Sequence, residues 1–226
     1  MRLRCSRAQR VVGAIVFCAV CVVAVLVRIW VVNAGAFTIP VETHPAGDLV
    51  ALEGAFAEYK YENTDGYSVR VGAARRMSIN EYLASYSKDP EAEEAYRFDE
   101  SNETDLNGMT LVVLDLEIHN DKSEGDEQGY LDSLGWALKS FDHPEFWIRT
   151  ESELLSCSIP QAEGAFQLSI RPKTSFTVHV PFASVRHNKF FPSASGTNEA
   201  PGLDAGKYEF VLTKAPVRKV VAFSVE

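Results

Sequence analysis

The stretch Met109–Asn120, MTLVVLDLEIHN, decides the fold class of this chain. Apolar residues occupy every second position at Val112, Leu114, Leu116 and Ile118, and the polar residues Asp115, Glu117 and His119 fall between them. Successive side chains of a strand point to opposite faces, so this alternation predicts one buried face and one face toward solvent. A strand with a single buried face is typical of an antiparallel sheet.

Shorter alternating segments lie on both sides of this strand. They are Ala55–Tyr61, Tyr67–Val71, Phe166–Ile170, Phe176–Phe182, Tyr208–Leu212 and Val221–Val225, and Trp136, Leu138, Phe141, Phe146, Trp147 and Ile148 supply further core material. About seven short strands with turn signals between them predict a mostly β fold, a two-layer antiparallel β-sandwich. We expect this domain to span residues 49–226.

One short helix is expected beside the strands. Ser78-Ile79-Asn80-Glu81 has the pattern of a capping box, in which the serine and glutamate side chains each bond a backbone N–H of the first turn. Apolar and aromatic residues follow at helical spacing, so the sequence predicts a helix from Ile79 to about Ser87. A parallel α/β sheet is disfavoured, because each parallel crossover usually needs a helix of its own.

The N-terminal part contains a long apolar run, Val11–Val32, with the sequence VVGAIVFCAVCVVAVLVRIWVV. A membrane-spanning helix needs about 20 such residues. Arg28 lies near the end of the run, where its guanidinium group can reach the water interface. Arginines precede the run and no acidic residue occurs before Glu42. The positive-inside rule therefore predicts a cytoplasmic tail at residues 1–10, a transmembrane anchor at 11–32 and an extracytoplasmic C-terminal domain.

A cleaved signal peptide is the alternative to an anchor. Ala34-Gly35-Ala36 resembles a signal-peptidase site, and cleavage after Ala36 would release the domain as a secreted protein. The apolar run is longer than the 7–15 residues typical of a signal peptide, which favours the anchor. In either case residues 33–48, which contain two prolines, are expected to form a stalk before the folded domain.

Charge and cysteine content limit the function further. Five of the 22 Lys and Arg residues lie before residue 33, whereas all 31 acidic residues lie after it, so the remainder carries a net charge of −14. This charge argues against binding to nucleic acid or anionic lipid. Cys157 is the only cysteine after the apolar run, so no disulfide forms within the domain. Its apolar neighbours favour a buried thiol.

Three loops are the candidate binding surfaces. They are Lys88–Gly108 and Asp121–Gln128, both rich in acidic residues, and Val185–Gly206. Loops carry the binding residues of many domains, because a rigid scaffold positions them at the surface. Calcium binding by the acidic loops remains open, although neither matches the spacing of an EF-hand loop.

No motif in the sequence indicates catalysis, a metal or a cofactor. Ser85-Tyr86-Ser87-Lys88 matches S-x-x-K but falls at the end of the short predicted helix. The histidines are scattered without metal-site spacing, although His119 and His179 would pair if their strands were neighbours. Trp136, Phe141, Phe146 and Trp147 fit a core better than a ligand groove. We therefore expect no catalytic residue, no metal ligand and no bound cofactor.

Several segments together resemble a known family. They are Glu62–Val71 (ENTDGYSVRV), Glu81–Leu83, Leu111–Asn120 (LVVLDLEIHN), Phe176–Phe182 (FTVHVPF) and Lys207–Leu212 (KYEFVL). In this order they resemble a family of unknown function found in anchored or lipid-linked ectodomains of high-GC Gram-positive bacteria. The family is similar to the bacterial immunoglobulin-like superfamily that includes small secreted antigens. The resemblance, over roughly residues 50–226, implies an immunoglobulin-like sandwich and no known activity.

The sequence thus predicts a non-enzymatic, single-pass membrane protein. Its extracytoplasmic domain is expected to bind another protein or a ligand at the cell envelope. The alternative is an envelope-associated hydrolase or accessory enzyme with an unrecognised site, which would require polar side chains converging in a cleft. A third option is a domain stabilised by Ca²⁺. The sequence identifies neither the partner nor the oligomeric state.

Overall fold

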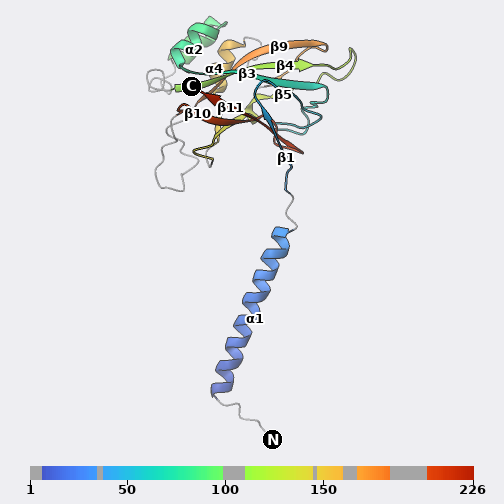
Figure 1. Cartoon of the computed structure of the whole chain (residues 1–226), viewed down its shortest axis with the longest axis vertical. Helices are drawn as coiled ribbons and strands as arrows, with labels where there is room; N and C mark the ends of the chain where they lie inside the picture. Colours follow the sequence, from blue (N-terminus) through green and yellow to red (C-terminus); the bar gives the residue numbers. More distant parts are fainter. Residues whose placement is uncertain (1–6, 35–37, 99–109, 145–146, 160–166, 184–202) are drawn as a thin grey trace. The chain divides into compact units, whose positions relative to one another are not determined.

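The computed structural model describes residues 7–34, 38–98, 110–144, 147–159, 167–183 and 203–226. The chain divides into two compact units, Met1–Thr38 and Ile39–Glu226. The first unit contains the helix α1, and the second contains all the strands and the remaining helices (Figure 1).

The helix α1 (Arg7–Ala34) covers the apolar run of the sequence. Its described side chains, at residues 16–31, are exposed. A search of the described residues for a helix with the length and apolar character of a membrane span finds none. The transmembrane helix at Val11–Val32 therefore stays a prediction from the sequence.

The second unit is built on one nine-stranded sheet of described residues. Its strands are β1 (Val41–Pro45), β2 (Leu49–Ala51), β3 (Tyr67–Ser78), β4 (Thr110–Asn120), β6 (Ala137–Ser140), β7 (Ile148–Thr150), β9 (Thr174–Ala183), β10 (Gly206–Val211) and β11 (Arg218–Val225). They follow the order β1-β11-β10-β6-β7-β9-β4-β3-β2. Every pair is antiparallel except β1 and β11, which run parallel. The short strands β5 (Leu131–Asp132) and β8 (Gln167–Leu168) pair separately, and a 3₁₀ turn, η1 (Ser133–Gly135), follows β5.

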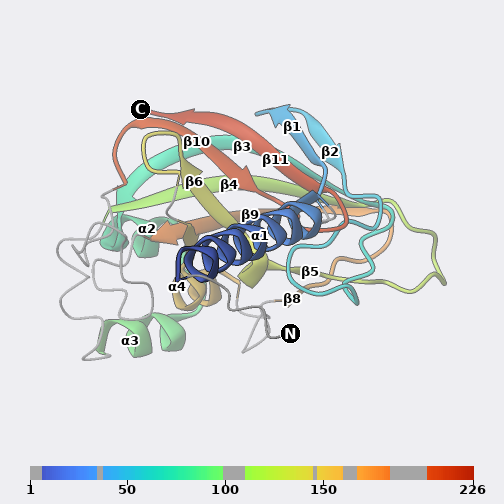
Figure 2. The same ribbon diagram turned by 90° about the horizontal axis from the view of Figure 1, so that it is seen from below.

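The two ends of the sheet order are joined by the tight turn between β1 and β2. In this turn the N–H of Ala46 donates to the carbonyl of Ala222 in β11 at 3.1 Å, and the N–H of Gly47 donates to the carbonyl of Val71 in β3 at 2.9 Å. Gly47 has a φ of +92°, which glycine adopts without steric cost. The turn thus links strands at opposite ends of the order, and the sheet curls into a nearly closed barrel (Figure 2).

The mostly β prediction is confirmed, and β4 has the predicted faces. Leu114 and Leu116 are fully buried, whereas Asp115 and Glu117 on the opposite face are partly exposed. The inner side chains of the sheet form the main core, in which the ring of Trp136 meets Phe210 edge-on at 5.7 Å between centroids. The sheet is continuous and nearly barrel-like, an arrangement that the alternation of apolar residues did not predict.

One predicted boundary and one predicted strand are wrong. The domain begins before residue 49, since β1 occupies residues of the predicted stalk 33–48 and pairs with the last strand. The predicted strand Ala55–Tyr61 is a loop that makes only an isolated bridge, between Phe56 and Ala215. The reason is a fully buried carboxylate, that of Glu62, which accepts hydrogen bonds from N–H groups that a strand would offer to a neighbour.

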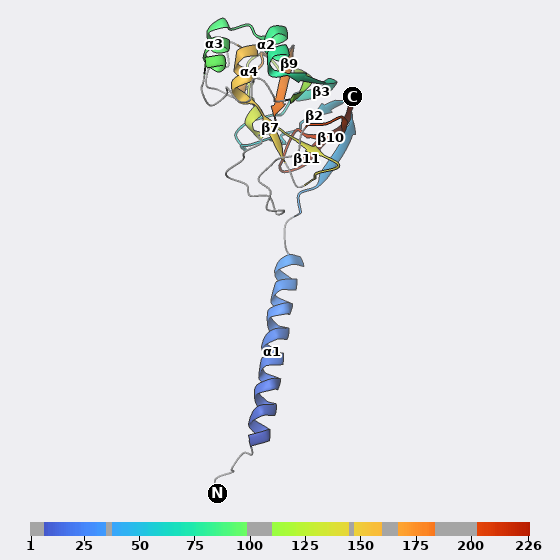
Figure 3. The same cartoon turned by 90° about the vertical axis from the view of Figure 1, so that its left-hand side faces the viewer.

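The helices form a layer on the outer face of the sheet. The predicted helix is present as α2 (Ile79–Tyr86), with both halves of its capping box. Two further helices, α3 (Pro90–Phe98) and α4 (Ser152–Ser158), were not predicted. Figure 3 shows the three helices gathered on one side of the sheet. Their apolar side chains share a second cluster with sheet residues: Ile79, Tyr82, Leu83, Tyr96, Leu111, Val113, Leu154, Cys157 and Ala183.

Helix α3 corrects the predicted loop Lys88–Gly108. Asp89 caps this helix, because its carboxylate accepts from the N–H groups of Glu91 and Ala92, each at 3.0 Å. Glu93 and Arg97 add an ion pair one turn apart. The rest of the predicted loop, residues 99–108, lies outside the described residues.

Candidate functional site

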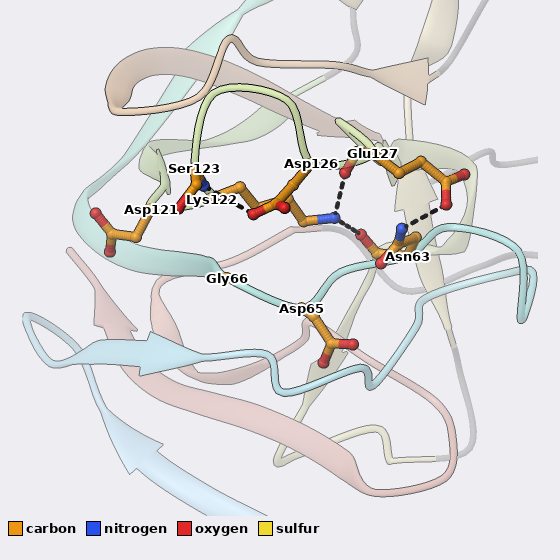
Figure 4. A pocket seen from close by; sticks show the side chains of 8 residues that line it. All are labelled: Asn63, Asp65, Gly66, Asp121, Lys122, Ser123, Asp126 and Glu127. Carbon is orange, nitrogen blue, oxygen red and sulfur yellow. Dashed lines mark hydrogen bonds between the residues drawn. The ribbon is translucent and has the colours of Figure 1, made fainter.

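A cleft of about 370 Å³ opens between the turn after Glu62 and the loop after β4 (Figure 4). Its lining residues are Asn63, Asp65, Gly66, Asp121, Lys122, Ser123, Asp126 and Glu127. Except for Gly66, each carries a polar or charged side chain. Small-molecule pockets are predominantly apolar, so this composition suits polar contacts with a larger partner better than a buried ligand.

Lys122 holds the two walls of the cleft together. Its side chain is buried, and its ammonium group donates to the carbonyl of Asn63 at 2.9 Å and to that of Glu127 at 2.8 Å. The same group lies over the ring of Tyr67, 5.7 Å from the centroid. Figure 4 shows the ammonium group between the two loops. These bonds and the burial of the side chain hold Lys122 in place, so this lysine positions the two walls of the site.

The end of β4 fixes the loop that follows it. The fully buried side chain of Asn120 donates to the carbonyl of Ile170 at 2.7 Å and accepts from the N–H of Lys122 at 3.1 Å. The next residue, Asp121, donates its N–H to the carbonyl of Gly66 at 2.8 Å. A hypothetical Cβ on Gly66 would lie 2.9 Å from Cγ of Lys122, so only glycine fits beside the lysine.

The opposite wall depends on the carboxylate of Glu62. One oxygen accepts from the N–H groups of Glu58 at 2.6 Å and Tyr59 at 2.8 Å. The other accepts from the N–H groups of Ala57 at 3.2 Å and Asp132 at 3.3 Å. Four backbone donors thus satisfy a buried charge that would otherwise be costly. The cleft therefore lies between two loops that buried charged side chains hold in place.

The carboxyl group of Asp132, beside Glu62, has a raised pKa. Burial raises the pKa of its carboxyl group, and the nearby negative charges of Glu62 and Glu58 raise it further. Its bond from the N–H of Leu134 and the charge of Lys214 act in the opposite direction. The wall therefore contains a buried carboxyl group, that of Asp132, whose pKa lies above its ordinary value.

Two exposed carboxylates of the cleft, those of Asp126 and Glu127, accept hydrogen bonds. Within the described ranges, no three His, Cys, Asp or Glu side chains are placed to hold an ion. Asp126 accepts from the N–H of Ser123 at 3.0 Å, and Glu127 accepts from the side-chain amide of Asn63 at 3.0 Å. The acidic loop 121–128 is thus held by one hydrogen bond within the loop and one to Asn63 of the facing turn, and Ca²⁺ binding there gains no support among the described residues.

The two strand histidines lie on neighbouring strands but do not meet. The register of β4 and β9 places His119 opposite Ser175 and His179 opposite Asp115. Nδ1 of His179 lies 2.6 Å from a carboxylate oxygen of Asp115. A zinc site shared by the two histidines is therefore excluded by register.

His179 belongs to a second polar cluster, which the sequence did not predict. Its ring stacks on Tyr86 of α2 at 4.2 Å between centroids. Arg75 of β3 contacts Asp115 and donates to the hydroxyl group of Tyr86 at 2.6 Å. These contacts join α2 to three strands, so we interpret the cluster as a structural support of the helix layer.

The remaining sequence candidates lie apart from the cleft. Ser85 is in the last turn of α2, and Lys88 follows that helix, with its N–H bonded to the carbonyl of Cys157. Cys157 is buried, as predicted, and burial raises the pKa of its thiol to about 11. Trp136 is a core residue, as predicted, whereas Phe141 and Trp147 are 54% and 40% exposed. Phe146 and most of the candidate loop Val185–Gly206 lie outside the described residues.

Fold and cleft define a class: a mostly β domain with a nearly closed sheet, an outer helix layer and a polar cleft between two fixed loops. The chain matches the family described as a domain of unknown function (DUF5028) over residues 41–219, and it belongs to that family. The match begins where β1 begins. No curated protein and no solved structure gives a match.

Proposed function

We propose that this chain is a non-enzymatic, membrane-anchored extracytoplasmic domain that binds another protein at the cell envelope. The observation that carries the proposal is the cleft face, where Lys122 and Glu62 fix the two loops in one conformation. Loops held in this way lose little conformational entropy on binding, which favours affinity for a partner. Of the three candidate loops in the sequence, 121–128 is the one that lies entirely within the described residues, and it lines this cleft.

The anchoring part of the proposal rests on the sequence alone. Val11–Val27 contains no charged residue, arginines precede it, and all acidic residues follow it. The proposed relation to immunoglobulin-like antigens of Gram-positive bacteria also rests on the sequence, because it depends on the family resemblance of Glu62–Val71 and the later strands. Alkaline extraction of membranes tests the anchor: the full chain should stay in the pellet. Release of the chain into the supernatant would contradict the anchor and would indicate a peripheral or secreted domain.

A binding role explains the polar groups better than catalysis does. A hydrolase needs a nucleophile or an activated water beside its acid and base. The closest such arrangement of described residues is Asp115 with His179, whose contacts are a hydrogen bond between Nδ1 and the carboxylate and the stack on Tyr86. Among the described residues no serine, threonine or cysteine side chain bonds to this histidine.

Charge reversal in the cleft tests the proposal. The carboxylates of Asp65 and Asp121 are exposed and line the cleft. The tagged full chain, crosslinked on intact cells, should capture a specific envelope protein, and Asp65→Lys with Asp121→Lys should lose it. Asp48→Lys with Glu94→Lys makes the same change in charge at exposed positions outside the cleft lining, and capture should persist.

Equal capture by all three chains would contradict the proposed face. No specific capture by any of them would remove the case for binding. Each variant should keep the melting temperature of the unaltered chain, since exposed carboxylates contribute little to stability.

A further inference from the structure

Two tyrosines project from the loop that Glu62 holds. Tyr59 is 52% exposed and Tyr61 is 73% exposed, and Lys60 between them is exposed as well. Within the described part of the chain neither tyrosine hydroxyl makes a hydrogen bond. Large aromatic side chains at the surface are unusual enough to mark a contact surface when they occur together. We call Tyr59, Lys60 and Tyr61 the tyrosine tip.

The backbone beneath the tyrosine tip is fixed at many points. The carboxylate of Glu62 accepts the N–H of Tyr59, and the N–H of Glu62 donates back to the carbonyl of Tyr59 at 3.1 Å. Before the tip, the N–H of Phe56 donates to Ala215 at 2.8 Å. After it, the hydroxyl of Thr64 donates to Ala55 at 2.7 Å. The tyrosines are therefore presented on a rigid turn.

A rigid turn suits tyrosine as a contact residue. Tyrosine offers a large apolar surface and a hydroxyl group, with only two side-chain torsions to fix on binding. Residues of this kind carry much of the binding energy at protein interfaces. Because the turn is already ordered, the free energy of binding is not consumed by ordering the backbone.

The kind of partner is indicated by Lys60. Its ammonium group lies over the ring of Tyr61, 5.1 Å from the centroid, which is a cation–π contact. The exposed ring thus already attracts a cation from its own chain. A cationic side chain of a partner can take the same place, since Lys60 is long, exposed and free to turn aside. Arginine is the cation most often found over aromatic rings in proteins.

The surroundings of the tyrosine tip favour a basic partner for a separate reason. Asn63 and Asp65, a few residues further on, belong to the cleft with its exposed carboxylates. The chain after residue 32 has a net charge of −14, which attracts positively charged proteins over a distance of about one Debye length. Attraction brings the partner near, and the tyrosine rings give its cations a defined position.

We propose that the tyrosine tip is the contact point for an arginine-bearing segment of the partner protein. This inference rests on the proposed function, because it names the partner chemistry of the same face. The arginine side chains stack over the rings of Tyr59 and Tyr61 while the neighbouring carboxylates balance their charge.

Peptide binding tests the proposal. The probe is a labelled peptide of alternating glycine and arginine, with a glycine–glutamate peptide as the negative control, and fluorescence anisotropy with the purified full chain gives the Kd. Tyr59→Leu with Tyr61→Leu removes both rings and no charge. An exposed cation–π contact is worth roughly a factor of two to five, so the double variant should bind about five- to twentyfold more weakly. Phe141→Leu, at another exposed aromatic, should leave the Kd unchanged.

Lys60 provides a second readout. Lys60→Gln frees the ring of Tyr61 and should tighten peptide binding by about two- to fivefold. Lys207→Gln makes the same charge change at an exposed position on β10 and should have a smaller effect. Equal effects of the two lysine variants, or an unchanged Kd of the double tyrosine variant, would overturn the inference and leave only general charge attraction.

The cell experiment separates the two proposals. If charge reversal in the cleft abolishes capture of the envelope protein while the double tyrosine variant still captures it, the tyrosine tip is not the contact point and the proposed function stands. If both variants lose the partner, the inference is supported. The melting temperature of the double variant should stay unchanged, because both tyrosines are exposed.

Discussion

The interior of the sheet and the two loops at the cleft are stabilised by opposite kinds of side chain. The interior contains fully buried apolar groups such as Leu116, Trp136 and Phe210. The loops depend on buried charged groups, Glu62 and Lys122, each bonded to backbone atoms. Apolar packing tolerates exchange of one apolar group for another of similar size. A buried charge has no such substitute, because its removal leaves backbone donors or acceptors unpaired.

The largest expected effect is in the interior. Trp136 is fully buried and the largest such side chain. Trp136→Ala should lower the free energy of unfolding by about 3–5 kcal/mol, because it leaves a cavity in a closed core. Urea unfolding followed by circular dichroism measures this loss.

Trp136→Phe is the matched control. Within the described residues the indole N–H of Trp136 has no hydrogen-bond partner, so phenylalanine removes an unpaired donor along with some volume. We expect a loss below about 1.5 kcal/mol. A loss as large as that of the alanine variant would show that the interior is no more tolerant than the loops.

The second largest effect is expected in the loop that Glu62 holds. There a nearly isosteric substitution should lower the free energy of unfolding. Glu62→Gln replaces one carboxylate oxygen by an NH₂ group, which cannot accept from the N–H groups facing it. Two backbone donors lose their partner, and we expect a loss of about 2–4 kcal/mol. Hydrogen exchange should speed up at residues 57–59.

Glu58→Gln is the control in the same loop. The carboxylate of Glu58 forms a partly exposed ion pair with Lys214 at 2.5 Å, and exposed pairs contribute about 0–1 kcal/mol. If Glu62→Gln were as mild as Glu58→Gln, the loop would not depend on the buried carboxylate.

The smallest effect concerns an ionisable group inside an apolar cluster. Burial raises the pKa of the Cys157 thiol from 9.0 to about 11, and the charges of Glu93 and Asp89 add to the shift. A raised folded-state pKa gives stability that is complete below pH 9 and is lost as the pH rises toward 11. At pH 10, one unit above the ordinary pKa of the thiol, the loss should be about 1.4 kcal/mol, since one pKa unit corresponds to about that free energy.

Comparison with Cys157→Ala isolates this contribution. Unfolding free energies measured from pH 8 to above pH 10, in the range of ordinary thiol titration, should fall less steeply for the variant than for the unaltered chain. Parallel curves would mean that the thiol ionises as readily in the folded chain as in the unfolded one.

The same contrast explains which parts of the structure could be predicted. The faces of β4 follow from strict alternation, and the start of α2 follows from the capping box at Ser78 and Glu81, because both depend on near neighbours in sequence. Helix α3 also had a local signal, since Asp89 and Pro90 are typical of a helix start. The acidic composition of the following residues obscured it.

The cleft depended on distant residues and could not be predicted. Lys122 bonds to Asn63, which lies far from it in the sequence, and Glu62 bonds to Asp132. Nothing in the neighbourhood of Glu62 or Lys122 distinguishes them from other surface charges. The sequence did mark 121–128 as an acidic loop, but it did not show that this loop lies beside residues 63–66. The near closure of the sheet was missed for the same reason, because it depends on the pairing of β1 with β11.

That pairing constrains how the domain is made. The chain leaves the ribosome from its N-terminus, so β1 emerges early, whereas its partner β11 emerges after the other described strands. Until Arg218–Val225 is available, β1 has no neighbour and one edge of β10 stays open. The sheet is therefore completed only after Arg218–Val225 has been made, and until then the unpaired strand edges are surfaces on which a chaperone can act.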